Sequence, residues 1–336
     1  MYMAIRKAVT TSRTGNNMSS PKVLILTHGD TDGVCAAAIA KKTYPNAKVE
    51  FTVASDLSSR LRGLSGFDRL IIMDLRLDKE HIEEGKRALA EISKTCSIIY
   101  IDHHPFPKRT TQKDLAACDT IVHRTNASTS ELALEFFKPP PSHEFIAVLG
   151  AIGDYQDQTL RIKKLIKRYG TRKCYPEALY LDRALRVVDD SFRRRMTDEL
   201  ARGKWPQETT LAKEYASKVV KQRKIIEDYV RGKSRRVCMH ALFVGDVPFK
   251  ASGLSAELLV ELLGAEVGIA SYRMGRHLYL STRRRWESDV RLNELMGECT
   301  SAVGGSGGGH VGASGGKIPA QKLDDFLKLV RWHLCE

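Results

Sequence analysis

Aspartate and histidine recur in four short motifs in the first half of the chain. Residues 27–33 read Thr-His-Gly-Asp-Thr-Asp-Gly, and the other three motifs are Met73-Asp74, Asp102-His103-His104 and Gly153-Asp154-Tyr155. Carboxylates packed together repel one another and take up protons unless a divalent cation, or two, neutralises them. Because the donors are oxygen and imidazole nitrogen without thiolate, the set suits Mn²⁺ or Mg²⁺ better than a structural zinc site.

Each motif follows an apolar run that predicts a strand or a helix. Strands are predicted at residues 23–28, 49–53, 69–74 and 97–102, and helices near 34–42, 79–92, 129–137 and 144–152. Near-continuous apolar strands that alternate with helices indicate an α/β domain with a parallel sheet covered on both faces. Ligands of such sheets bind beyond the carboxyl ends of the strands. We therefore expect the four motifs to meet at one edge of one sheet.

Each motif taken alone has an ordinary structural explanation. A single aspartate after a strand, such as Asp74, is usually a turn residue or a helix cap. His28 alone would be a satisfied buried histidine, and Ser128 or Thr129 is expected to cap the helix that follows it. The metal-site interpretation depends on finding the motifs together and in this order.

The order of the motifs resembles the DHH phosphoesterase superfamily. A Gly-Gly-Gly-His run at residues 307–310 resembles the DHH-associated C-terminal domain of its branch of RecJ-like exonucleases and oligoribonuclease-like enzymes. The resemblance covers residues 21–160 and 237–334. It implies a phosphodiesterase that hydrolyses single-stranded DNA or RNA, or short oligonucleotides, exonucleolytically. Two divalent cations are implied as cofactors, with Mn²⁺ as the first candidate and Mg²⁺ as the second.

The resemblance also implies a shell of six ligands for the two cations. These are His28 and Asp30 for the first cation, Asp32, His103 and Asp154 for the second, and Asp74 as the bridge between both. No ligand position is substituted, which argues against an inactive relative. Two cations about 4 Å apart lower the pKa of a water between them and neutralise phosphate oxygens.

Two other residues of the Asp-His-His motif are implied beside the metals. Asp102 would orient the site from behind the ligands, and His104 would contact or polarise the phosphate. Together with Asp74 and His103, these two residues make up the predicted catalytic set.

The second half of the chain carries candidates for substrate binding. Glycines let backbone amides approach an anion because no side chain blocks them. With the family motif, this predicts that Gly307, Gly308, Gly309 and His310 hold a phosphate or a terminal nucleotide, although Val311 stands where the family often has proline. By the same resemblance, Arg283, and after it Arg285, is the candidate phosphate-binding arginine. The alternative is a basic loop without this role.

Nearly all of the net charge of +14 comes from one segment. Residues 161–236 hold 23 Lys or Arg and 10 Asp or Glu, a net charge of +13, among apolar residues at helical spacing. We expect a basic helical connector whose surface attracts a phosphate backbone. A helical linker with a solvated basic face is the alternative.

The 336 residues suggest two domains joined by this connector. We predict a flexible N-terminal extension at 1–20, a DHH catalytic domain at 21–160, the connector at 161–236 and a smaller α/β substrate-binding domain at 237–336. The smaller domain has predicted strands at 237–244, 267–272 and 277–282 and predicted helices at 255–263 and 320–334. The active site is expected in the cleft between the domains.

The remaining sequence features concern membrane association and the cellular location of the protein. No apolar run approaches the roughly 20 residues of a membrane span, which excludes an integral membrane protein. Seven widely spaced cysteines without a Cys-x-x-Cys pair predict neither a disulfide framework nor a cysteine zinc site, and favour a cytoplasmic location.

Two rival functions stay open at this point. One is a small-substrate phosphoesterase that cleaves very short RNA, cyclic dinucleotides or pAp. The other is a non-catalytic replication or repair scaffold. A nuclease with a DNA-repair role that also binds a replication or repair protein is compatible with the same residues.

Overall fold

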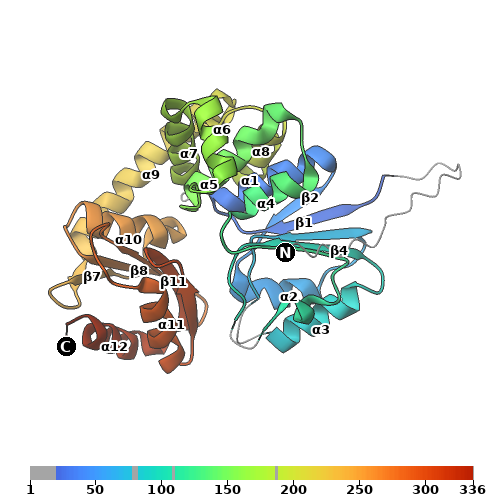
Figure 1. Ribbon diagram of the computed structural model, residues 1–336. Coiled ribbons are helices and arrows are strands. Elements are labelled where there is room, and N and C mark those ends of the chain that lie inside the picture. The colour runs from blue at the N-terminus through green and yellow to red at the C-terminus, as the bar shows by residue number, and fades with distance from the viewer. Residues whose placement is uncertain (1–19, 78–81, 108–109, 186–187, 336) are drawn as a thin grey trace, which may run out of the picture. The chain divides into compact units, whose positions relative to one another are not determined.

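The computed structural model describes residues 20–77, 82–107, 110–185 and 188–335, without the side chains of 213–219 (Figure 1). The predicted N-terminal extension lies outside the described residues except for Ser20, as does the start of the helix predicted at 79–92. The chain divides into two compact units, residues 1–213 and 214–336.

The first unit is built on a five-stranded parallel sheet. Its strands are β1 (Val23–Thr27), β2 (Lys48–Phe51), β3 (Arg69–Met73), β4 (Ser97–Asp102) and β5 (Thr120–His123), in the order β2-β1-β3-β4-β5. All four pairings are parallel. The predicted parallel α/β fold is confirmed, and β5 is a strand that the apolar pattern did not predict.

Helices cover both faces of this sheet (Figure 1). Helices α1 (Thr31–Thr43), α4 (Thr129–Phe137) and α5 (Glu144–Gly153) lie on one face, and α2 (Leu57–Arg62) and α3 (Ile82–Ile92) lie on the other. The first ten residues of α1 are buried, because its small residues Ala36 to Ala38 allow close packing. Strands buried on both faces explain the continuous apolar runs in the sequence.

The basic segment is helical, as predicted, and most of it belongs to the first unit. Helices α6 (Leu160–Tyr169) and α7 (Thr171–Leu185) pack against α5, and α8 (Asp190–Ala201) packs against α1. Helix α9 (Leu211–Lys233) begins in the first unit and continues into the second. Helices α6, α7 and α8 add a layer over the face that α1 and α5 cover.

The second unit contains a six-stranded mixed sheet. Its strands are β6 (Arg235–Arg236), β7 (Ala241–Val244), β8 (Val267–Met274), β9 (His277–Arg284), β10 (Ser306–Gly309) and β11 (Ala313–Pro319), in the order β10-β11-β9-β8-β7-β6. Only β7 and β8 pair in parallel. The strand predicted at 237–244 begins too early, because β7 starts at Ala241. Strands β10 and β11 and helix α11 were not predicted.

Helices cover both faces of the second sheet as well. Helix α10 (Ser252–Glu261) lies on one face, and α11 (Leu292–Ala302) and α12 (Leu323–Cys335) lie on the other. A core of apolar side chains, among them Ile269, Leu280, Met296 and Phe326, joins the last two helices to the strands.

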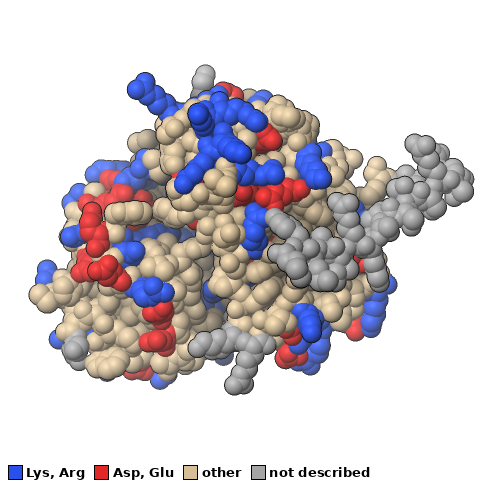
Figure 2. Space-filling view, viewed as in Figure 1, with Lys and Arg blue, Asp and Glu red and all other residues tan. Residues whose placement is uncertain are grey.

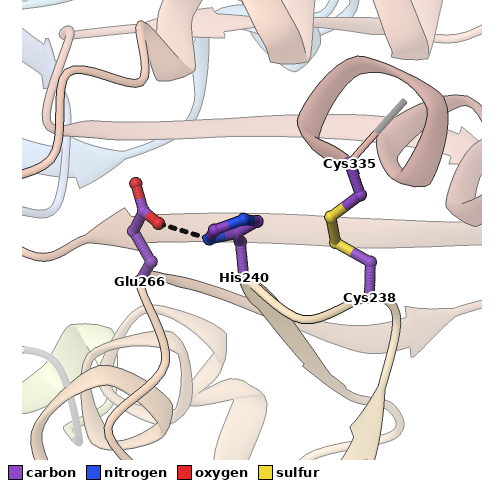
Figure 3. Close-up of a disulfide and its surroundings, with 4 residues drawn as sticks. All are labelled: Cys238, His240, Glu266 and Cys335. Carbon is purple, nitrogen blue, oxygen red and sulfur yellow. Dashed lines mark hydrogen bonds and ion pairs between the residues drawn. A yellow bond between two sulfur atoms is a disulfide. The ribbon is translucent and has the colours of Figure 1, made fainter.

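Cys238 and Cys335 form a disulfide in this unit (Figure 3). Their Cα atoms are 6.4 Å apart although 97 residues separate them in sequence. The sequence predicted no disulfide framework and gave no indication of this single pair, which forms because the fold brings the end of α12 beside the turn before β7. The other five cysteines are buried thiols. None of the described helices combines the length and the apolar composition of a membrane span.

Candidate metal centre

Three neighbouring strands of the first sheet end in candidate ligands. Thr27 of β1 pairs in register with Met73 of β3, and Met73 pairs with Ile101 of β4. His28 and Asp74 follow the first two of these positions directly, and His103 follows the end of β4. Because parallel strands end at the same edge of a sheet, the three motifs meet where the sequence predicted.

Three groups of potential metal ligands share Asp74. The first group is His28, Asp30 and Asp74, the second is Asp32, Asp74 and His103, and the third is Asp74, Asp102 and His104. Within each group, one ligand atom from every residue lies within 4.8 Å of the others. The first two groups match two neighbouring cation sites with Asp74 between them.

The distances around these groups are short. His28 Nδ1 lies 2.8 Å from Asp30 Oδ2 and 3.9 Å from Asp74 Oδ2. His103 Nε2 lies 3.5 Å from Asp74 Oδ1 and 3.4 Å from Asp154 Oδ2. Asp154, at the C-terminal end of α5, therefore joins the second group.

The N-terminus of α4 fixes two of the carboxylates. The backbone amides of Thr129 and Ser130 donate to the two oxygens of Asp32 at 2.6 and 2.9 Å. The Thr129 hydroxyl donates to Asp74 Oδ1 at 3.1 Å. A helix N-terminus favours negative charge, and here it holds a protein carboxylate. Ser128 caps α4, as predicted, by accepting from the Glu131 amide.

Backbone conformation at the site is unusual in two places. Asp74 has φ 55° and Tyr155, directly after Asp154, has φ 57°. For residues other than glycine this left-handed region costs roughly 1–2 kcal/mol, and it persists where the surrounding structure enforces it. Both strained residues thus lie at, or next to, a candidate ligand.

Electrostatics at the site favour cation binding. Burial, followed by the Asp154 and Asp30 carboxylates, raises the pKa of Asp32 to about 7. Burial and the Asp30, Asp32 and Asp154 carboxylates also raise the pKa of Asp74 well above its usual value.

One carboxylate oxygen of Asp74, Oδ2, is buried without a hydrogen-bond donor among the described residues. A buried carboxylate oxygen without a donor, inside a cluster of acids, costs free energy that a divalent cation removes. The residues therefore fit two divalent cations.

Asp102 and His104 form a hydrogen-bonded pair next to Asp74. His104 Nδ1 lies 2.9 Å from Asp102 Oδ1, and the Tyr100 hydroxyl lies 3.3 Å from Asp102 Oδ2. Burial alone would raise the pKa of Asp102, but the charge and hydrogen bond of His104 and the charges of His103 and His123 together lower it. An ionised Asp102 only accepts hydrogen bonds, so Nδ1 of His104 carries a proton.

Arg193 of α8 is a residue of the site that sequence reasoning missed. Its Nε donates to the carbonyl oxygen of Gly29 at 2.9 Å, and its Nη2 donates to Leu185 O at 2.7 Å. Burial and the charge of Arg193 both lower the pKa of His28. The Asp30 and Asp154 carboxylates raise it by more, so the pKa of His28 is raised overall. In the sequence, Arg193 was one member of a basic run, which gave no sign of this position.

The glycine tract of the second unit is a strand. Ser306–Gly309 form the edge strand β10, which is paired antiparallel with β11. Gly309 has φ 144°, and a Cβ at Gly307 would lie 2.6 Å from Thr300 Oγ1, so both positions favour glycine. The His310 carbonyl accepts from Ser314 Oγ at 2.8 Å, which orders the turn into β11.

The candidate arginines lie beside this turn. Ala313 of β11 pairs with Arg283 of β9, and the Arg284 amide donates to Gly312 O at 3.4 Å. Arg283 Nη1 donates to Thr282 O, whereas the side chain of Arg285 is bound to the Gly264 carbonyl. Of the two candidates, Arg283 lies directly across from the His310 turn.

Family models match both units. Residues 22–159 match the DHH family, N-terminal domain, and residues 237–333 match the DHHA1 domain. The first match includes all six candidate metal ligands, and the second includes Arg283 and His310. No curated protein sequence matches the chain.

Solved structures share the fold at low sequence identity. A DHH-domain protein described as a member of a family of ribosomal proteins is 16% identical, with a TM-score of 0.61, over 94% of this chain and 87% of that one. RecJ of Thermus thermophilus in complex with Mn²⁺ is 15% identical, with a TM-score of 0.61, over 93% and 52%. A pGpG-specific phosphodiesterase of Vibrio cholerae is 14% identical, with a TM-score of 0.51, over 93% and 98%.

Proposed function

Because the chain belongs to the DHH family and carries a DHHA1 domain, we propose that it hydrolyses single-stranded nucleic acid or short oligonucleotides from one end. Members of the DHH family are metal-dependent phosphoesterases. The observation that supports the proposal most directly is that the first two ligand groups share Asp74. Asp74 Oδ2, which is buried and accepts no hydrogen bond from a described residue, adds to this support.

His28, Asp30 and Asp74 would hold one cation, and Asp32, Asp74, His103 and Asp154 would hold the other. Bound there, Mn²⁺ or Mg²⁺ supplies a water of lowered pKa and neutralises phosphate oxygens. The N-terminus of α4 keeps Asp32 and Asp74 in place, so little reorganisation is needed when the substrate binds.

His104 would act on the phosphate. Its Nδ1 proton is held by Asp102, which orients the ring. The Nε2 atom would then hydrogen-bond a phosphate oxygen or hold a proton for the leaving oxygen. In the second unit, Arg283 and His310 would bind a phosphate or the terminal nucleotide, since guanidinium groups suit phosphate.

A second candidate function is a phosphodiesterase for dinucleotides, cyclic dinucleotides or pAp. The similarity of fold to a pGpG-specific phosphodiesterase favours it. The two candidates differ in the length of substrate that is cleaved fastest.

One assay separates these functions. End-labelled single-stranded RNA and DNA of graded length are incubated with Mn²⁺ or Mg²⁺, and the rate is compared with that on a dinucleotide. Cleavage that removes nucleotides from long strands supports the nuclease, and a sharp preference for dinucleotides supports the second candidate. Failure to cleave any of these substrates would favour a non-catalytic replication or repair scaffold.

A further inference from the structure

Helix α6 presents an exposed face of cations without acids. Residues 158–176 contain seven Lys or Arg and no Asp or Glu. Ile162, Leu165 and Ile166 are buried at helical spacing, which turns the remaining residues of α6 outward. Figure 2 shows Lys and Arg gathered over α6 at the top of the view.

Four of these seven cations have no partner in the described part of the chain. The side chains of Lys163, Lys164, Lys167 and Arg172 are exposed, and none forms an ion pair or hydrogen bond with a described residue. The other three pair with single acids: Arg161 with Glu135, Arg168 with Glu144 and Lys173 with Glu208. A face that holds several unpaired like charges is unfavourable by itself and attracts a polyanion.

The rest of the basic segment differs from α6. Later bases alternate with acids, as where Arg202 and Lys204 both pair with Glu199. The basic run at residues 231–236 belongs to the second unit. Residues 161–176 thus supply seven of the 13 excess positive charges, without any acid, and they lie on the unit that carries the metal centre.

The start of α6 is tied to the metal centre. Thr159, its N-cap, donates to both carboxylate oxygens of Glu131, at 3.0 and 2.9 Å. Glu131 directly follows Thr129 and Ser130, whose amides hold Asp32. The unpaired cations therefore begin one helix turn beyond a residue anchored beside the site.

The other end of α6 lies away from the site. Arg168 binds Glu144 and the Tyr169 hydroxyl donates to Pro141 O at 2.7 Å, both near the start of α5. Asp154 lies just beyond the opposite end of α5. Helix α6 thus runs antiparallel to α5, away from the metal ligands.

We propose that the α6 face, which is Lys163, Lys164 and Lys167 of α6 together with Arg172 in the first turn of α7, binds the phosphate backbone of a single strand whose end lies at the metal centre. This inference rests on the proposed phosphodiesterase function and selects long strands over dinucleotides as the substrate. The ten residues of α6 span about 15 Å. At about 3.4 Å per phosphate of a stacked strand, this length accommodates roughly four phosphates.

The test compares the wild-type chain with the triple variant Lys163→Gln, Lys164→Gln, Lys167→Gln. All three side chains are exposed, so the fold is retained. The variant should cleave a dinucleotide at the wild-type rate and lose roughly ten- to hundredfold in kcat/KM on a long single strand at low salt. The slope of log Kd against log salt for that strand should fall by about 2, since each lost contact with single-stranded nucleic acid removes about 0.7.

A charge-matched control is Lys48→Gln, Arg62→Gln, Lys94→Gln, which removes three exposed cations from other elements. This control should keep the wild-type length dependence. Equal activity of the α6 variant and the control on the long strand would overturn the inference. It would indicate that the α6 face binds a different partner, such as an acidic protein. A wild-type chain inactive on every length would overturn the proposed function instead.

Discussion

The Arg193 guanidinium donates a hydrogen bond to the carbonyl oxygen of Gly29, 164 residues earlier in the chain. Gly29 lies between the candidate ligands His28 and Asp30, so helix α8 supports the backbone of the first ligand group. Arg193 also donates to Leu185 O and pairs with Asp190 at 2.8 Å. Arg193 is thus a positioning residue that reaches no ligand directly.

Arg193→Ala should therefore weaken metal binding. The substitution leaves the Gly29 and Leu185 carbonyls without their donors, which costs about 1–3 kcal/mol for each poorly solvated group. We expect roughly a tenfold or greater rise in the Kd for Mn²⁺ in calorimetric titration, with partial recovery in Arg193→Lys. The exposed neighbour Arg194→Ala is the matched control. An unchanged Kd in Arg193→Ala would refute the positioning role.

Much of the first unit could be predicted from the sequence, because its signals are local. Residues 69–74 and 97–102 are apolar runs that end in aspartate, and the structure has strands there. Since parallel strands end at one edge, strand prediction alone placed Asp74 near His103. The helix predicted at 129–137 coincides with α4.

The missed features depend on contacts between distant residues. Strand β10 consists of serine and glycines, which have low strand propensity, yet close packing against Thr300 and β11 requires glycine there. The Cys238–Cys335 disulfide joins residues 97 positions apart. Neither feature, nor the position of Arg193, has a local sequence signature.

Asp74→Asn should abolish activity while the chain stays folded. The amide keeps the shape of the carboxylate but removes the charge shared by the ligand groups. Because cations supply several kcal/mol of transition-state stabilisation, kcat should fall at least about a thousandfold. Circular dichroism checks the fold, and Asp157→Asn, in the loop that follows α5, serves as the control. Normal activity of Asp74→Asn would invalidate the site assignment.

The metal-free protein should lose stability as the pH rises through the range from about 4 to about 7. Asp32 has a pKa near 3.8 when unfolded and about 7 when folded, so over this range the folded state holds a proton that the unfolded state releases. Stability then falls with rising pH. Mn²⁺ binds the ionised form, so its addition should raise Tm more at about pH 7.5 than at about pH 5.5. Thermal denaturation with EDTA or Mn²⁺ measures this, and Asp32→Asn should flatten the pH dependence. A Tm gain that does not change with pH would contradict the prediction.

Arg283→Ala and His310→Ala should weaken binding of an oligonucleotide end. A lost hydrogen bond to a charged group costs about 1.5–3 kcal/mol, which is roughly a ten- to hundredfold rise in KM. Trp286, three residues after Arg283, is 85% exposed and reports binding through its fluorescence. The fluorescence is measured in a Trp332→Phe background, because this change removes the signal of the other exposed tryptophan. Unchanged KM and unchanged quenching in both variants would exclude these two residues as substrate contacts.

Gly150→Ala should damage the metal centre by steric contact alone. A Cβ at Gly150 would lie 2.2 Å from Ser130 Oγ and 2.8 Å from Asp32 Oδ1, both of which are buried. Since α5 and α4 must separate to admit the methyl group, we expect a loss of about 1–3 kcal/mol in the free energy of unfolding. Displacement of Asp32 should also weaken Mn²⁺ binding. Gly63→Ala, whose added Cβ meets no atom within 4 Å, is the matched control. Urea unfolding and Mn²⁺ titration of the two variants measure both effects, and wild-type values for Gly150→Ala would show that the contact between α4 and α5 does not hold Asp32 in place.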